Sequence, residues 1–289
     1  MAKAFSVLSW NIEHLKDKQP ARIKRVVKTL KSEKPDVFAL YEVEGKDIYD
    51  DISDEMQNYS FHITEGSQTQ EILVGVKNTM TSFFSQRVEF KSGNTRLRPG
   101  AMLSLKINHI NYTLMFLHLK SLTKPVGLGI RDDQFERLYK LKKKLDAKAP
   151  GNNRANFIAL GDFNTMGMNY RGRKHDIPAE AELNKLDLDI KRKSVRMQRL
   201  IKSTPRTWSN GSSSRYNPSD LDHVIASDHL EFKAWSHKSP VNEENASHTI
   251  EKAHVDVRGW VDQSSISKQD KWIEDYSDHS YLYFEVQKV

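Results

Sequence analysis

The chain has 289 residues, with 45 Lys and Arg against 38 Asp and Glu, and a formal net charge of +7. This excess of positive charge favours a polyanionic partner such as nucleic acid or an anionic lipid, although a solvated basic surface gives the same balance. The chain contains no cysteine, so disulfides and thiol catalysis are excluded, and any metal ion must bind to oxygen or nitrogen ligands. No apolar run reaches about 18 residues and the first residues lack a signal-peptide pattern, so we expect a cytoplasmic protein without a membrane span.

Strands and helices are both predicted along the chain. Residues 5–9 form a β-rich run, Pro20 opens a helix with apolar residues at helical spacing, and residues 36–41 form an apolar strand, which together indicate a β–α–β unit. A short helix is expected within 44–58 and a longer one over 131–145. Further strands are predicted at 72–76, 101–107, 112–117, 156–161, 223–227 and 280–286.

This mixture of hairpins and helical crossovers predicts an α/β (α+β) fold in which two stacked sheets are flanked by helices. No Pro/Gly-rich linker divides the chain, so we expect a single domain over residues 1–289 and a monomer. A basic, helix-bearing insertion is predicted at about 166–217, because ten Lys and Arg lie between Arg171 and Lys202. The Ser/Gly/Asn-rich run at 209–217 is expected to be a flexible loop. Residues 236–275 are expected to be irregular.

Six short polar motifs follow or end the strand-like runs. They read SWNIEH (9–14), ALYEVE (39–44), FLHLKS (116–121), ALGDFNT (159–165), SDLDHVIAS (219–227) and YSDHSYL (276–282). Strands that end in Asn, Glu, His and Asp place carboxylates, amides and imidazoles on one rim of a packed scaffold. Polar groups that converge on such a rim are typical of hydrolytic sites.

The GDFNT motif carries the sharpest signal. Its glycine allows a tight turn after the strand, and Asp162 and Asn164, two residues apart, can then face the same way. A carboxylate with an amide is suited to orient an attacking water near a phosphate. The alternative is an ordinary Asx-turn after a strand.

The YSDHS motif places Asp278 and His279 side by side before the last strand. Adjacent side chains on a strand diverge, so one can bind a metal ion while the other faces a phosphate. An imidazole in that position needs a carboxylate partner, for which Asp222 is the candidate. The alternative is a Ser-Asp-His turn that only caps the strand.

Glu42 ends an apolar run and is the candidate magnesium ligand, because Mg²⁺ binds through one or two carboxylates and keeps several waters. The alternative is a solvated Glu, and Glu44 is a weaker candidate. Asn11 can support the metal ligand or a phosphate oxygen. Glu13 lies two residues after Asn11 in the same motif.

His118 ends another strand and can donate to a phosphate oxygen, while Lys120 adds positive charge there. Arg131 and Gln134 share one face of the predicted helix. Arg131 can reach a substrate from that face, or it can be an ordinary surface residue.

Taken together and in this order, the motifs resemble the endonuclease/exonuclease/phosphatase superfamily, which includes DNase I-like and exonuclease III-like proteins. The resemblance runs from Ser9 to Leu282. The HLKS motif with the R-x-x-Q spacing is similar to the His-bearing, tyrosyl-DNA phosphodiesterase branch. Exonuclease III-like apurinic endonucleases have Tyr where His118 stands, and the usual Arg-Ile-Asp is here Asp220-Leu221-Asp222.

The resemblance implies a four-layer α/β/β/α sandwich, a divalent cation (Mg²⁺ or Mn²⁺) and in-line attack of water on a phosphoester. It implies that Glu42 is the main metal ligand, with Asn11 and Asp278 close to the metal and Glu13 further off. The roles that it implies for the remaining residues are water activation by Asp162, phosphate binding by Asn164 and His118, and acid or phosphate-binding chemistry by His279 with Asp222.

We therefore expect a nuclease or phosphodiesterase that acts on DNA or RNA, with Glu13, Lys120 and Arg131 among its phosphate or substrate contacts. The alternative is a phosphatase or phosphodiesterase for inositol phosphates or phospholipid head groups. A catalytically silent binding protein on the same fold is the third hypothesis.

Overall fold

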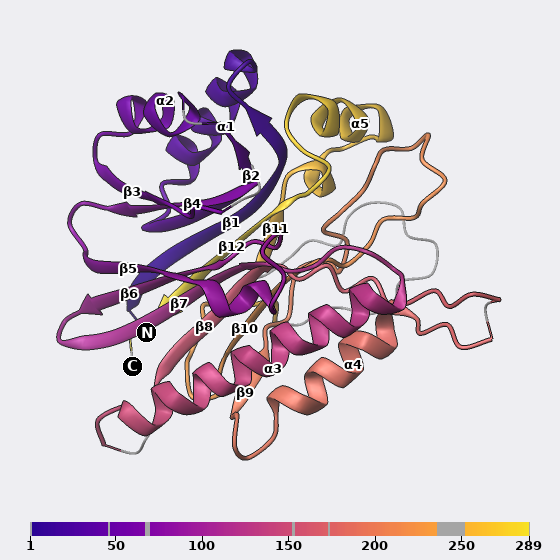
Figure 1. The fold of residues 1–289 in the computed structure, drawn as a ribbon. Coiled ribbons are helices and arrows are strands. Elements are labelled where there is room, and N and C mark those ends of the chain that lie inside the picture. The colour runs from indigo at the N-terminus through magenta and orange to yellow at the C-terminus, as the bar shows by residue number, and fades with distance from the viewer. Residues whose placement is uncertain are drawn as a thin grey trace.

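A computed structural model describes residues 2–45, 47–66, 70–151, 154–172, 174–235 and 252–288. Within these residues twelve strands form two mixed sheets of six strands each, and five α-helices lie outside them (Figure 1). No helix in these ranges combines the length and the apolar character that crossing a membrane requires.

The first sheet contains the predicted β–α–β unit. Its strands, in spatial order, are β11 (Asp256–Arg258), β12 (Tyr281–Gln287), β1 (Lys3–Lys16), β2 (Val37–Glu44), β4 (Glu71–Lys77) and β3 (Tyr59–Ile63). Strands β1 and β2 are parallel, and α1 (Pro20–Glu33) connects them. The apolar face predicted for this helix is the buried one, which confirms the unit.

The second sheet contains the central hairpin. Its strands, in spatial order, are β5 (Thr81–Arg87), β6 (Gly100–Ile107), β7 (Ile110–His118), β8 (Asn156–Asp162), β10 (Asp222–Ser227) and β9 (Met197–Arg199). Strands β6 and β7 form the predicted hairpin, and β7 runs parallel to β8 after α3 (Pro125–Lys148).

Three apolar clusters hold four layers together. One lies between the two sheets, where residues such as Val74 and Leu114 are fully buried. A second packs the first sheet against α1 and α2 (Asp47–Glu55), and a third packs the second sheet against α3 and α4 (Ala179–Ile190). Figure 1 shows the two helical layers on opposite sides of the paired sheets, which confirms the predicted α/β/β/α sandwich.

The segment predicted as a helix-bearing insertion contains a helix, and the stretch predicted to be irregular contains regular elements. The segment predicted as an insertion at 166–217 supplies α4 to the outer layer and β9 to the edge of the second sheet, so it is an integral part of the sandwich. The stretch 236–275 contains β11 and α5 (Ile266–Asp275). Residues 236–251 of that stretch lie outside the described residues.

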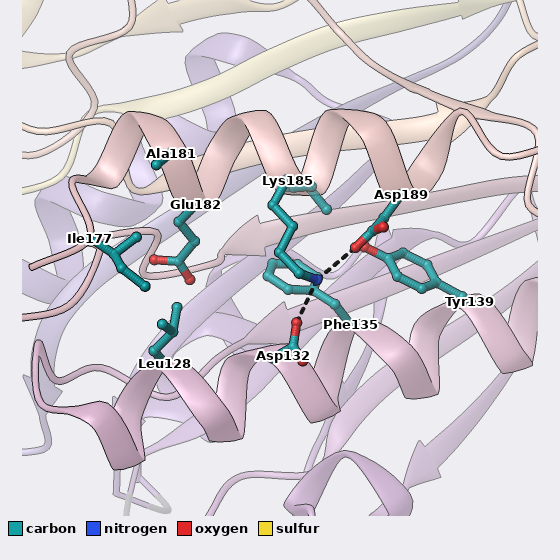
Figure 2. A pocket seen from close by; sticks show the side chains of 10 residues that line it. Leu128, Asp132, Phe135, Tyr139, Ile177, Ala181, Glu182, Lys185 and Asp189 are labelled. Carbon is teal, nitrogen blue, oxygen red and sulfur yellow. Dashed lines mark hydrogen bonds and ion pairs between the residues drawn. The ribbon is translucent and has the colours of Figure 1, made fainter. Parts of the chain in front are cut away.

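Five of the ten cations between Arg171 and Lys202 are ion-paired in the described residues. Lys185 of α4 donates to Asp132 of α3, across the crevice between the two helices, and to Asp189 of α4, both at 2.7 Å (Figure 2). The same segment contains four further ion-paired cations: Arg192 with Glu136, Arg196 with Asp146, Arg199 with Asp187, and Lys202 with Asp220. These pairs reduce the positive charge that is available for the phosphate contacts suggested by the composition of this segment.

Candidate active site

The sheet registers bring the polar motifs to one edge of the sandwich. In the first sheet Asn11 of β1 lies opposite Tyr41, next to Glu42. In the second sheet Asp162 of β8 lies between His118 of β7 and Asp222 of β10. The parallel pairs β1/β2 and β7/β8 end at this edge, and β10, antiparallel to β8, begins there, so these residues meet.

The end of strand β8 requires a glycine. Gly161 has φ +133, and a Cβ there would lie 2.1 Å from the carbonyl oxygen of Leu117 and 2.7 Å from the hydroxyl of Tyr41. Only glycine allows this close approach of β7 and β2. The approach places Asp162, the next residue, against the groups of the facing sheet.

Asn11 joins the two sheets at the centre of the site. Its Nδ2 donates to Glu42 Oε1 at 3.2 Å and to Asp162 Oδ2 at 3.0 Å. Glu42 has φ 64, where the pairing of β2 with both neighbours is irregular. Such left-handed conformations are unfavourable for a residue other than Gly or Asn and are concentrated at functional sites.

His279 is held by the carboxylate that the sequence suggested. Its Nδ1 lies 2.8 Å from Asp222 Oδ2, and its Nε2 lies 4.0 Å from Asp162 Oδ2. Burial opposes protonation, but the carboxylates of Asp222, Asp278 and Asp162 raise the pKa of His279 well above 6.5. His279 is therefore an imidazolium at neutral pH, with Nε2–H directed toward the site.

The pKa values of Asp162 and His118 are shifted in opposite directions. Burial raises the pKa of Asp162 to about 7, and the Asp222 carboxylate adds to the effect, while His279 opposes it. His118 Nε2 lies 3.5 Å from Asp162 Oδ2 and 3.6 Å from Glu42 Oε1. Burial, with Arg98 next in effect, lowers the pKa of His118 well below 6.5, so one histidine of the site is neutral and the other is charged.

Asp278 is anchored by a hydrogen bond through one oxygen, and its other oxygen lies 3.9 Å from His279 Nε2. Its Oδ2 accepts the indole N–H of Trp208 at 2.7 Å, and its Oδ1 is buried without a hydrogen-bond partner. The Glu13 carboxylate accepts from the backbone N–H of Asp278 at 3.3 Å, which places Glu13 at the rim. Ser277 fixes the turn, because its Oγ donates to the Asn11 carbonyl at 2.7 Å and accepts from the His279 N–H at 3.0 Å.

The oxygen atoms of this site fit a magnesium-type cation. Across the described part of the chain, no three His, Cys, Asp or Glu side chains are spaced to hold a metal ion by themselves. Mg²⁺ needs fewer, because it is bound through one or two carboxylates and keeps several waters. Glu42, the Asn11 amide and Oδ1 of Asp278, which accepts no hydrogen bond, meet that requirement.

Two further predicted residues lie at the site in different settings. Asn164 is buried with φ 51, and its Nδ2 donates to the Leu119 carbonyl at 3.2 Å. At least part of its amide therefore fixes the segment after β7. Lys120, two residues beyond His118, lines an adjoining cavity.

Arg131 was predicted to reach the substrate, but the structure places its side chain elsewhere. Its guanidinium is fully buried, pairs with Glu182 at 2.6 and 2.8 Å, and donates to the carbonyl oxygens of Lys120, Leu122 and Gly167 at 2.9–3.1 Å. These bonds use the donors of the side chain. Arg131 therefore supports the segment that carries Lys120 and does not face the site.

Sequence reasoning missed several residues at this edge. His14, whose side chain is exposed, donates its backbone N–H to Glu42 Oε2 at 3.2 Å, and Gln70 donates to the same oxygen at 3.4 Å. The indole of Trp208 was also missed. No spacing rule singles out these residues, because the His14 contact is made by the backbone, and Gln70 and Trp208 lie outside the strands, where the path of the chain depends on the rest of the fold.

Lys202 compensates for the Asp that replaces the usual Arg in the Asp220-Leu221-Asp222 run. Its buried ammonium pairs with the Asp220 carboxylate and donates to the Asp222 carbonyl at 2.6 Å.

We expect Lys202→Met to lower the free energy of unfolding by about 3 kcal/mol, because removing one partner leaves a buried charge uncompensated. Urea denaturation measures this, and adding Asp220→Asn should restore part of the loss. A Lys202→Met protein as stable as the parent would exclude a stabilising pair.

Comparisons with known proteins agree with this arrangement. The sequence matches the Endonuclease/Exonuclease/phosphatase family over residues 8–279. A search of curated proteins returns no match. Among solved structures, truncated Caenorhabditis elegans TDP2 is similar with 17% identity and a TM-score of 0.61, covering 98% of this chain and 97% of that one.

Two other solved structures have the same fold. Danio rerio TDP2 complexed with single strand DNA product has 15% identity and a TM-score of 0.65, covering 98% of this chain and 99% of that one. The mannosyl-6-phosphatase Bt3783 of Bacteroides thetaiotaomicron has 14% identity and a TM-score of 0.58, covering 98% and 100%. At these identities the likeness shows the fold alone. The match over residues 8–279 shows more: the chain belongs to the Endonuclease/Exonuclease/phosphatase family.

Proposed function

We propose that this protein is a divalent-metal-dependent phosphodiesterase that hydrolyses DNA or RNA, with water attacking phosphorus in line with the leaving oxygen. The observation that carries the proposal is the meeting of Asn11, Asp162 and His279 at the sandwich edge, with contacts of 3.0 and 4.0 Å between them. A neutral amide, a buried carboxylate and an imidazolium at one point form a set suited to a phosphoryl centre.

Glu42 and Asn11, with Asp278 beside them, are the residues that would hold Mg²⁺ or Mn²⁺. When bound, the cation neutralises charge on the phosphoryl and leaving oxygens. Its charge also favours the ionised form of the neighbouring Asp162 carboxyl.

The chain's own groups carry the remaining steps. The Asp162 carboxylate orients the attacking water and accepts its proton. His279, as an imidazolium held by Asp222, donates through Nε2–H to a phosphoryl oxygen as negative charge develops there. His118, neutral, faces the same space through Nε2, and Asn164 fixes the turn after Asp162.

Nucleic acid is the preferred substrate for two reasons. The chain carries a net charge of +7, which favours association with a polyanion. A protein of the same fold, Danio rerio TDP2, is described in complex with single strand DNA product.

A phosphatase or phosphodiesterase for small phosphoesters, including inositol phosphates and phospholipid head groups, is the second candidate. Bt3783, a phosphatase, has the same fold. The pairing of five cations between Arg171 and Lys202 also removes charge that a long nucleic-acid groove would use.

A panel of phosphoester substrates, assayed with Mg²⁺ and with EDTA, tests the proposal. We expect hydrolysis of single-stranded DNA or RNA that EDTA abolishes, that added Mg²⁺ restores, and that falls steeply between low and moderate salt. Hydrolysis of inositol phosphates or sphingomyelin alone would favour the second candidate. No hydrolysis of any substrate with either Mg²⁺ or Mn²⁺ would contradict both.

Glu42→Gln tests the cation site directly. Because the amide removes the negative charge that attracts the ion, we expect half-maximal activity to require at least about tenfold more Mg²⁺. Glu44→Gln is the matched control, two residues along β2, and should titrate as the parent does. A Mg²⁺ titration unchanged in Glu42→Gln would remove Glu42 from the proposed ligands.

A further inference from the structure

A cavity of about 360 Å³ adjoins the candidate active site. It lies between the loop before β6 and the segment after β7, and its lining consists of Gln70, Asn94, Arg96, Leu97, Arg98, Lys120 and Ser121. Three of these residues are cationic and none is acidic. Gln70 belongs to both spaces, because it also donates to Glu42 Oε2 at 3.4 Å, and Lys120 follows His118 by two residues.

Within the part of the chain that the structure describes, the three cations of this cavity have no directly paired carboxylate. Among the described residues, no side-chain hydrogen bond and no ion pair within 4 Å is found for Arg96, Arg98 or Lys120, and the buried Nε of Arg98 has no partner. The basic segment of α4 and β9 behaves differently, since Lys185 and Arg199 are each matched by an aspartate. A half-buried guanidinium without a partner is costly unless an anion satisfies it.

Arg98 and Lys120 also repel one another electrostatically. Burial lowers the pKa of Lys120, and Arg98 is the next cause of that lowering. Burial lowers the pKa of Arg98 as well, and the Glu42 and Asp162 carboxylates counteract the effect, which places Arg98 within electrostatic range of the candidate active site. A bound anion would relieve the repulsion between the two cations.

The walls of the cavity are fixed before any ligand binds. Gln134, buried in α3, donates to the Phe90 carbonyl at 2.8 Å on one wall and accepts from the Lys120 N–H at 3.1 Å on the other. Arg131 holds the carbonyl oxygens of Lys120 and Leu122 at 3.1 and 3.0 Å. The R-x-x-Q pair of α3 therefore preorganises the segment that carries Lys120.

We propose that this cavity is a subsite for a second, non-reacting phosphate of the substrate, bound by Arg96, Arg98 and Lys120. This inference rests on the proposed phosphodiesterase function and narrows it to substrates in which another phosphate lies one nucleotide from the scissile one. Arginine is suited to that role because its fork of N–H donors matches two phosphate oxygens. Esters with a single phosphate leave the cavity without an anion and lose this contribution.

Two pairs of chromogenic substrates test the subsite. Thymidine 5′-(p-nitrophenyl phosphate) is compared with its 3′-phosphorylated form, and thymidine 3′-(p-nitrophenyl phosphate) with its 5′-phosphorylated form. We expect the added phosphate to raise kcat/KM at least about tenfold in one of the two pairs, with most of the gain lost at high salt.

The variants Arg96→Gln and Arg98→Gln should bring that ratio close to one. Arg96 is exposed, so its replacement leaves the fold intact even where loss of the buried Arg98 does not. Lys143→Gln, which removes an exposed cation from α3, is the matched control and should keep the parent ratio. A parent ratio near one in both pairs, or a ratio unchanged in both arginine variants, overturns the inference.

A binding measurement separates the subsite from the chemistry. By calorimetry, thymidine 3′,5′-bisphosphate should bind at least about tenfold more tightly than both thymidine 5′-monophosphate and inorganic phosphate, and Arg96→Gln should remove the difference. If the bisphosphate binds more tightly as expected but no ester is hydrolysed, the proposed function is contradicted and the proposed subsite is still supported. Hydrolysis without the difference in binding contradicts the subsite alone.

Discussion

Replacing Asp162 with Asn is expected to lower kcat/KM on the best phosphodiester substrate by at least about 10²-fold. The amide keeps the size of the side chain, and its single oxygen can still accept from Asn11, at 3.0 Å in the parent, at the expense of the bond from the Asn164 N–H. The amide cannot accept a proton from water. General-base groups typically contribute rate factors of about 10²–10⁴. Steady-state kinetics under saturating Mg²⁺ measure the loss.

The same variant should be more stable than the parent, which separates lost chemistry from lost folding. Burial raises the pKa of Asp162 to about 7, so the carboxylate opposes folding above its unfolded pKa, and increasingly so up to about pH 7. The neutral amide removes this effect, and we expect a higher Tm for Asp162→Asn than for the parent at pH 8 without added metal. Asp54→Asn, on the exposed face of α2, is the matched control. Turnover within tenfold of the parent, or a lower Tm, would contradict the assignment.

Asp222→Asn and His279→Gln are each expected to lower kcat/KM by at least about 10²-fold. Asp222 holds the His279 ring by the 2.8 Å contact and keeps it protonated. An imidazolium aimed at a phosphoryl oxygen stabilises charge that appears only in the transition state, so its loss affects kcat more than KM. His109→Asn, in the exposed turn between β6 and β7 and at positive φ, serves as the histidine control.

The pH profile tests the protonation state of His279. Its folded pKa lies well above 6.5, so the imidazolium persists through neutral pH and activity is lost only as pH rises through that raised pKa. The Asp222→Asn variant removes the strongest carboxylate effect, so the alkaline limb should move to lower pH. An alkaline limb at the same pH in parent and variant would show that another group controls it.

The fold was largely predictable because it follows from periodicity. The helical spacing of Ile23 and Val26 identified the buried face of α1, and the alternation of apolar runs with turns identified β6 and β7 as a hairpin. Elements without such a signal were missed. The edge strand β5 is half exposed, and α5 buries none of its residues deeply, so neither shows a strong apolar pattern.

The sequence predicted which residues lie at the candidate site better than it predicted which partners they contact. The strand-end motifs correctly brought Glu42, Asp162 and His279 to one edge, although 117 residues separate the last two. Arg131 was misplaced because helical spacing assigns a face and not a partner, and the partner, Glu182, lies 51 residues away. The proposed anion subsite had no sequence signal for the same reason, since it depends on three cations that share a cavity lined by no acidic residue.

By itself, the order of residues determined the layered architecture, the exclusion of thiol chemistry and the set of side chains available at strand ends, because these depend on local periodicity and composition. The tertiary structure alone decided which cations are neutralised, which histidine carries a proton and which carboxyl titrates near neutral pH. Charge interactions and burial depend on distances of a few ångströms between segments remote in the chain. No local pattern encodes those distances.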